Sequence, residues 1–278
     1  MRFLRFIPLA ALVFVGACDQ EGAITNAKHP PLAFIRYVHA VPDIGALDFQ
    51  FVDQIDYSPQ YSATTFRTVG VYQGAEAGSR RIKVFRNSSN IDTTKLTLVD
   101  TTLTLAANTY YTILHMGYYN VGSGTPAQRF RVITDTRVDQ NTGLHVGAIN
   151  AVIGAGTANQ DVFVGTPAGT PMFSNLAPGV RSTPLYAARA TGTFTINTTA
   201  TGLLVSLASA TPIAGVVADT ILPGLSDPVG GFSIAGTQFT AFLFPRSTAG
   251  SLAPQTAAFT VPAVVMITDR QPPRTVPN

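Results

Sequence analysis

The chain has 278 residues, of which 46% are hydrophobic and 12% are charged, with a formal net charge of +3 and a single Cys. Disordered chains carry more charge and fewer apolar residues, so this composition indicates a folded protein. One Cys cannot pair within its own chain, which excludes a disulfide-stapled scaffold. The length predicts about two domains.

The first 17 residues have the layout of a secretory signal peptide. Arg2 and Arg5 form a short basic region, residues 6–15 are apolar, and small residues follow at Gly16 and Ala17. The apolar run is shorter than the roughly 20 residues that a membrane-spanning helix needs. We therefore predict that residues 1–17 are cleaved from the mature protein.

The residue after this segment is Cys18, and Val15-Gly16-Ala17-Cys18 resembles the lipobox of bacterial lipoproteins. In that motif the thiol takes a diacylglycerol and the new amine is acylated, usually with palmitate, and several acyl chains give stable anchoring. The alternative is a buried structural Cys. The sequence thus predicts a lipid anchor on the periplasmic face of a membrane or on the cell surface, and Asp19 favours the inner membrane.

Cleavage also changes what the basic pI of about 9.1 implies. Losing Arg2 and Arg5 leaves 16 of the 18 basic residues against 15 acidic ones. A nearly neutral protein gives no electrostatic support for nucleic-acid binding, so we expect no nucleic-acid partner.

Residues 18–31 are predicted to form the lipidated terminus and a polar tether, and strand patterns begin after them. Short runs rich in Val, Ile, Thr, Phe and Tyr alternate with turn residues, and no window has a sustained helical period. In one run, Ile82 and Val84 point to one face of the strand and Lys83 to the other. The predicted strands are 33–39, 46–52, 63–72, 80–86, 97–105, 109–116 and 128–135.

The second half of the chain repeats landmarks of the first. Each copy contains a tyrosine at a matched position, and the matched residues that follow this tyrosine have the same spacing in both copies. Each copy also ends on Ile-Thr-Asp, at residues 133–135 and 267–269. The pattern predicts an all-β protein of two tandem Ig-like antiparallel β-sandwich domains, each seven-stranded. Their expected ranges are 32–137 and 138–270, followed by a Pro-rich tail at 271–278.

The largest insertion in the second copy contains residues 202–225, which are markedly apolar. Pro212 and Pro223 argue against a membrane span. We predict core strands with a loop here, and the alternative is an exposed apolar contact surface.

A family resemblance is carried by residues 35–43, Ile-Arg-Tyr-Val-His-Ala-Val-Pro-Asp, and by Asp-Phe-Gln-Phe at 48–51. These residues resemble the opening of domain-of-unknown-function family 4397. The resemblance implies exported bacterial proteins, often tandem Ig-type lipoproteins, and no established activity. In the second copy, Asn150 stands where His39 would be, so a function of His39 with Asp43 would belong to the first domain.

His39 and Asp43 are candidates for an acid/base pair or for ligands of a metal, together with Asp48. The structural alternative is that Pro42-Asp43 forms a turn in which the Asp side chain bonds nearby amides, with His39 donating to that turn. We favour the structural alternative. The chain has no HExxH, G-x-S-x-G or G-x-G-x-x-G motif, and we predict neither a metal nor another cofactor.

Basic residues supply the other candidates for binding. Arg36 belongs to the motif just described, and Arg81 and Lys83 lie in the densest basic patch of the chain. A solvated strand face with charged edge protection is the alternative for the patch.

We expect a lipid-anchored cell-envelope protein that is a non-enzymatic binding or structural module for a protein or glycan partner. The alternatives are an envelope polysaccharide hydrolase, which would use Asp43 and Asp48, and a subunit of a surface assembly that pairs through strand edges. The sequence leaves the ligand and the oligomeric state open.

Overall fold

The structure is a computed structural model that describes residues 30–53, 60–90, 96–136, 142–154, 159–216 and 229–270. The predicted signal peptide, Cys18 and Asp19, most of the tether and the tail at 271–278 lie outside the described residues. Residues 32–278 form one compact unit, separate from residues 1–31. Within the described part of the chain, no helix is long and apolar enough to cross a membrane.

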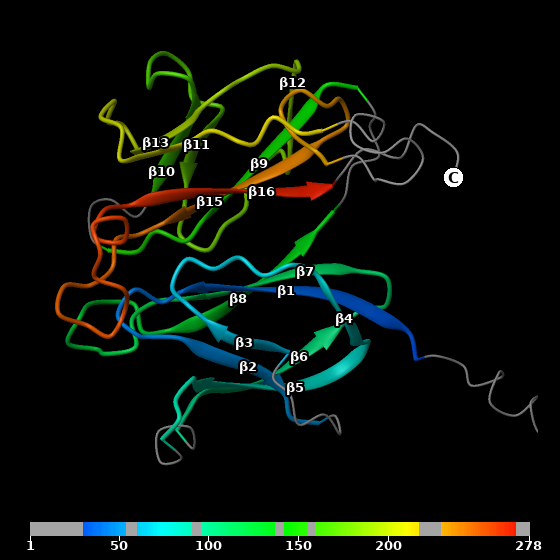
Figure 1. The fold of residues 1–278 in the computed structure, drawn as a ribbon, viewed down its shortest axis with the longest axis vertical. Coiled ribbons are helices and arrows are strands. Elements are labelled where there is room, and N and C mark those ends of the chain that lie inside the picture. The colour runs from blue at the N-terminus through cyan, green and yellow to red at the C-terminus, as the bar shows by residue number, and fades with distance from the viewer. Residues whose placement is uncertain are drawn as a thin grey trace, which may run out of the picture. The chain divides into compact units, whose positions relative to one another are not determined.

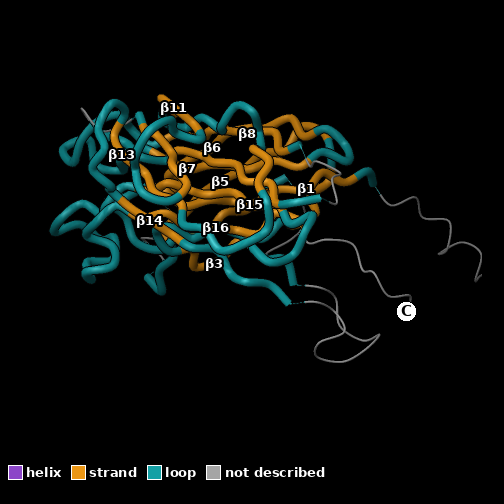
Figure 2. The backbone as a smooth tube through the Cα atoms, turned by 90° about the horizontal axis from the view of Figure 1, so that it is seen from above, coloured by secondary structure: helices purple, strands orange, loops and turns teal. Residues whose placement is uncertain are grey.

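The described residues form strands and loops, without helices, as the sequence predicted (Figure 2). Sixteen strands make four four-stranded sheets, two from each half of the unit. The first half, here called the first sandwich, contains β1 (Leu32–Ala40), β2 (Leu47–Phe51), β3 (Tyr61–Thr64), β4 (Gln73–Glu76), β5 (Gly78–Arg86), β6 (Thr97–Leu105), β7 (Tyr110–Met116) and β8 (Arg129–Asp135).

The second half, here called the second sandwich, repeats this arrangement. Its strands are β9 (Leu144–Asn150), β10 (Gln160–Val164), β11 (Phe173–Leu176), β12 (Ala187–Arg189), β13 (Ile196–Ala200), β14 (Ala208–Ala210), β15 (Gln238–Phe244) and β16 (Ala263–Arg270). The sheets of the first sandwich have the orders β4-β1-β7-β8 and β3-β2-β5-β6, and those of the second have β12-β9-β15-β16 and β11-β10-β13-β14. Each strand of the first sandwich therefore has a counterpart eight places later.

The central strands of two sheets, β4-β1-β7-β8 and β12-β9-β15-β16, are buried on both faces, and we call these sheets the inner sheets. One face of each packs inside its own sandwich, and the other packs against the facing inner sheet (Figure 1). Every residue of β9 and of β15 is buried. The inner sheets are also mixed, because β1 pairs in parallel with β7 and β9 pairs in parallel with β15. The expectation of purely antiparallel sheets is therefore corrected at these two pairs, where burial on both faces suits parallel pairing.

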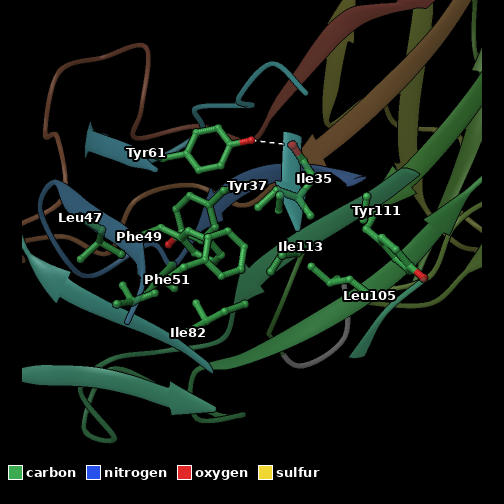
Figure 3. Close-up of a cluster of buried hydrophobic side chains, with 14 of the residues drawn as sticks. Ile35, Tyr37, Leu47, Phe49, Phe51, Tyr61, Ile82, Leu105, Tyr111 and Ile113 are labelled. Atoms are coloured by element: carbon green, nitrogen blue, oxygen red, sulfur yellow. Dashed lines mark hydrogen bonds between the residues drawn. The ribbon is translucent and has the colours of Figure 1, made fainter. Parts of the chain in front are cut away.

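Alternation along the inner strands divides the apolar residues among three cores. Ile35 and Tyr37 of β1 enter the core of the first sandwich, which Figure 3 shows around Phe49 and Ile82. The next residue, Val38, faces the other way and joins the third core, which lies between the sandwiches. That core also contains buried Met116, Ile149, Phe242 and Phe244. Burial of this much apolar surface stabilises the contact between the two sandwiches.

The predicted strands agree with the structure in part. Strand β6 has the predicted bounds 97–105, and Ile82 and Val84 are buried in β5 while Arg81 is exposed. The prediction of a strand at 63–72 is wrong for most of its length, because β3 ends at Thr64 and a turn follows. Each sandwich also has eight strands instead of seven, since the short β4 and β12 carry too few apolar residues to be recognised.

The predicted core position of the apolar segment 202–225 is contradicted where the structure describes it, up to residue 216. Only β14 is a strand there, and Leu203, Leu204 and Val205 are 56%, 62% and 70% exposed. Hydropathy alone could not distinguish a buried strand from an apolar loop, because both patterns lack charge.

Candidate binding surface

The turn that follows β1 is organised by the side chain of His39. Its Nε2 lies 3.1 Å from the carbonyl oxygen of Gly45, and its Nδ1 accepts a hydrogen bond of 3.3 Å from the amide of Val41. These two contacts place the proton on Nε2. His39 has no exposed surface, and burial lowers its pKa to about 4, so the imidazole is neutral at pH 7.

The same turn holds two loops through Pro42 and Asp43. The Asp43 carboxylate, 4% exposed, accepts hydrogen bonds of 2.8 Å from the amides of Tyr119 and Asn120. The carbonyl oxygen of Pro42 accepts a bond of 2.8 Å from the amide of Thr248. One loop belongs to the first sandwich (117–128) and the other to the second (245–262), so the turn joins both halves of the unit.

The loop at 245–262 is also held by a cation. The guanidinium of Arg67 donates to the carbonyl oxygens of Ala258 at 2.7 Å and Pro245 at 2.8 Å, and also to those of Phe259 and Val261. Burial lowers the pKa of Arg67 to about 10. Its backbone has a φ of +71°, which is uncommon for a residue with a side chain. Position 67 lies in the range predicted as a strand, and this conformation ends any strand pairing there.

Several loops at this end of the strands (left in Figure 1) carry exposed apolar side chains. Val121 is 79% exposed and Leu252 is 59% exposed, and Leu252 lies against Gly45 of the turn. The exposed residues 203–205 follow β13, whose last residue Ala200 pairs with Gln160 at the start of β10. We call the set Tyr119, Val121, Leu203, Leu204, Val205 and Leu252 the loop-end surface.

The chain enters the compact unit at the other end of the strands. Strand β1 begins at Leu32 and runs toward His39 and the turn. Leu32 therefore lies at the end of the strands opposite the loop-end surface.

Arg36 lies in the interior of the protein and not on a binding face. It is 1% exposed, donates to Thr112 Oγ1 at 2.7 Å, and pairs with Asp269 of the second sandwich at 2.5 Å. Its guanidinium also lies 4.7 Å from the ring centre of Tyr72. Burial lowers the pKa of Arg36, but Asp269, Tyr72 and Asp135 together outweigh this effect, so the pKa stands above its ordinary value.

A second buried arginine forms the reverse ion pair between the two sandwiches. Arg181 of the second sandwich pairs with Asp135 of the first, and lies 4.8 Å from the ring centre of Tyr186. Each aspartate also accepts a tyrosine and a threonine hydroxyl of its own sandwich, so the two halves match. We call these eight residues the buried ionic network: Arg36, Tyr72, Thr112, Asp135, Arg181, Tyr186, Thr240 and Asp269.

The other sequence-predicted candidates lie in separate places. Asp48 accepts hydrogen bonds from the amide of Ala63 at 2.7 Å and from the Asn87 side chain at 3.1 Å. Arg81 and Lys83 both pair with Asp100 on the outer face of β5 and β6, at 2.8 Å and 3.4 Å. The hydrogen bonds that Arg81 donates to the Asp100 carboxylate raise the pKa of Arg81. The structure thus brings His39 and Asp43 together at one turn, and the basic pair together at another site.

The second sandwich has equivalent side-chain-to-backbone hydrogen bonds, in part made by different residue types. Asn150, in the place of His39, accepts a hydrogen bond from the amide of Val152 at 2.8 Å. Asp161, in the place of Asp48, accepts one from the amide of Asn175 at 2.7 Å. Asn175 has a φ of +52° and its counterpart Ala63 has +49°, so both aspartates support a left-handed residue.

Sequence reasoning did not identify the buried ionic network. Its aspartates, Asp135 and Asp269, end the repeated Ile-Thr-Asp, and its tyrosines are the matched Tyr72 and Tyr186. Polar residues that recur at the same positions of two diverged copies were the available signal. No group of three or more potential metal ligands occurs among the described residues.

Replacing Asp43 with alanine tests the role of the turn. We expect a loss of about 1–3 kcal/mol in the free energy of unfolding, because two buried amides lose their acceptor. Hydrogen exchange should become faster at the amides of Tyr119 and Asn120. The control is Asp53→Ala, which removes a partly exposed partner of Arg80 and should cost at most about 1 kcal/mol. Unchanged exchange at Tyr119 in the Asp43 variant would contradict this role.

Comparison with known proteins finds one family model that matches part of the chain. Residues 33–156 match the model of the family named Domain of unknown function (DUF4397). No curated protein matches the chain. Among solved structures, it is similar to a crystal structure named "Putative cell adhesion protein" from Parabacteroides distasonis ATCC 8503, with 11% identity and a TM-score of 0.18, covering 87% of this chain and 100% of that one. The matched residues 33–156 comprise the first sandwich and β9.

Proposed function

We propose that this protein is a lipid-anchored component of the bacterial cell envelope, whose loop-end surface binds a protein or glycan partner without catalysis. The observation that carries the proposal is the loop-end surface itself. Six apolar residues are exposed there. Asp43 holds the loop of Tyr119 and Val121, and Pro42 and Arg67 hold the loop of Leu252. Exposed apolar clusters with a polar surround are typical of interaction sites.

The anchor is proposed from the sequence. Cys18 ends a lipobox-like segment after a signal peptide, and it is the only Cys of the chain. Acylation there with diacylglycerol and palmitate would attach the protein to the periplasmic face of a membrane or to the cell surface, and Asp19 favours the inner membrane. The tether would join the strands at Leu32, the first residue of β1.

We also propose that the second sandwich is a diverged second copy of the DUF4397 domain. Its strand order is that of the first sandwich. Supporting details are the side-chain acceptors at Asn150 and Asp161, which match those at His39 and Asp48. The two copies would then form a single rigid platform, since the buried ionic network joins them.

Site-specific photo-crosslinking in intact cells tests the binding surface. A benzophenone amino acid replaces Val121 or Leu252 on the loop-end surface, and the matched control replaces Val71, which is 75% exposed elsewhere. We expect one saturable adduct from each loop-end position and none from position 71. Protease and glycosidase digestion of the adduct then identifies a protein or a glycan. Equal adducts from all three positions, or none, would refute the proposal.

The anchor is tested separately by growing cells with radiolabelled palmitate. The wild-type chain should carry the label and sediment with membranes. The variant Cys18→Ser should carry no label, because serine cannot form the thioether. Label that persists in Cys18→Ser would refute the lipid anchor at Cys18. That result would not bear on the proposed role of the loop-end surface.

A further inference from the structure

Strand β16 is the last strand of the second inner sheet, and its outer edge borders a groove. Among the described residues, β16 pairs only with β15. The groove has a volume of about 520 Å³. Its lining consists of Val264–Thr268 of β16, the segment Ala210–Ile213 after β14, and Phe239. Five consecutive residues of β16 therefore border it, which is roughly 16 Å of extended chain.

The equivalent strand of the first sandwich shows what is unusual about β16. Strand β8 reads RFRVITD and β16 reads AVVMITD over the same positions. Arg129 and Arg131 of β8 thus correspond to Ala263 and Val265. Charged residues on an edge strand discourage pairing with another chain, because pairing would bury the charge. This protection is present on β8 and missing from β16.

The groove is wide at β16 because the facing strand is short and its side chains are small. Strand β14 has three residues, Ala-Ser-Ala, whereas its counterpart β6 has nine. Ala208 and Ala210 pair with Thr198 and Ile196, in the positions that Val99 and Thr101 occupy on β6. The first sandwich fills this side with Leu98, Val99, Leu103 and Phe130, which pack on its core.

We propose that the β16 groove binds an extended, uncharged segment of a partner polypeptide, which adds as a strand to the outer edge of β16. An edge strand offers main-chain donors and acceptors to such a segment, and pockets beside it select alternate side chains. None of the described residues that line the groove is charged, so the segment must have small or aliphatic side chains facing inward.

The same charge argument disfavours the long edge strands of the first sandwich of a second copy as the occupant, whereas pairing of β16 with β16 of a second copy is an outcome that the test below distinguishes. The long edge strands of the first sandwich carry Asp100 on β6, and Arg129 and Arg131 on β8. Their insertion would bring charge to an uncharged groove, which costs several kcal/mol. This site is separate from the loop-end surface, and the proposal does not depend on it.

The test uses the full chain in mild detergent and a fluorescent, blocked octapeptide Lys-Thr-Val-Thr-Val-Thr-Val-Lys, followed by anisotropy. We expect saturable binding, and slower hydrogen exchange at Val264–Thr268 when the peptide is present. The same peptide N-methylated at its six central residues should bind at least about tenfold more weakly, because it cannot donate main-chain hydrogen bonds.

A variant locates the binding on the protein. Ile213 is 58% exposed at the groove, so Ile213→Asp adds a charge without disturbing a core, and we expect a loss of affinity of roughly tenfold. The matched control Val71→Asp, at a position that is 75% exposed outside the groove and outside the loop-end surface, should bind normally. Four results would overturn the proposal: no saturable binding, equal binding of the N-methylated peptide, unchanged affinity of Ile213→Asp, or a dimer in which the β16 amides are already protected.

Discussion

Replacing Asp269 with alanine is expected to lower the free energy of unfolding by about 3–5 kcal/mol. The change leaves Arg36, which is 1% exposed, without its closest carboxylate. The hydroxyls of Tyr186 and Thr240 also lose their acceptor. Removing one partner of a buried ion pair costs more than removing a pair at the surface, because the remaining charge stays in a region of low polarity.

Urea denaturation of the full chain measures this loss, and two further variants show its origin. Asp100→Ala removes the exposed partner of Arg81 and Lys83 and should cost at most about 1 kcal/mol. The double variant Arg36→Met with Asp269→Leu should recover part of the loss, since no unpaired charge is then buried. A loss for Asp269→Ala as small as that for Asp100→Ala would contradict a buried network.

Lowering the pH from 7 to 5 is expected to reduce stability by about 2 kcal/mol for each of two histidines. His39 and His115 are fully buried, with ring centres 6.3 Å apart. Burial lowers the pKa of His39 to about 4 and that of His115 to about 3, and the charge of His39 lowers the latter further. An unfolded histidine has a pKa near 6.5, so the unfolded chain binds more protons. The contribution is therefore complete above pH 6.5 and is lost as the pH falls toward the folded values.

The variant His39→Asn tests this assignment, because Asn150 already serves at the equivalent position of the second sandwich. Its stability should fall about half as steeply between pH 7 and pH 5, as judged from urea denaturation at both values. His115, whose Nδ1 lies 2.7 Å from the Tyr37 hydroxyl, accounts for the remaining slope. Stability of the wild-type chain that does not change over this range would contradict the burial of neutral histidines.

The sequence was sufficient to predict the fold class and much of the strand pattern. Half-buried strands such as β5 and β6 alternate clearly, so their bounds could be read from the residues. The inner strands gave a weaker signal, since burial on both faces removes the alternation of apolar with polar residues. Their parallel pairing also depends on contacts between segments about 75 residues apart, such as β1 and β7, which no local pattern encodes.

The candidate site was predictable only where a side chain determines the structure of residues close to it in the sequence. The Pro42-Asp43 pair indicated a turn, and the Asp43 carboxylate does bond amides there, but the loop that it holds is 76 residues away. Arg36 looked like a binding residue because arginine is usually exposed. Its partner, Asp269, comes from the other sandwich, so only the three-dimensional structure could show that the charge is satisfied internally.

The central claim is that the two sandwiches form one cooperative unit, on which the loop-end surface is built. Differential scanning calorimetry of the full chain tests it most directly. We expect a single transition whose calorimetric and van 't Hoff enthalpies agree, and which moves as a whole to lower temperature in Asp269→Ala. Two separable transitions, with only one of them shifted by the substitution, would contradict the claim.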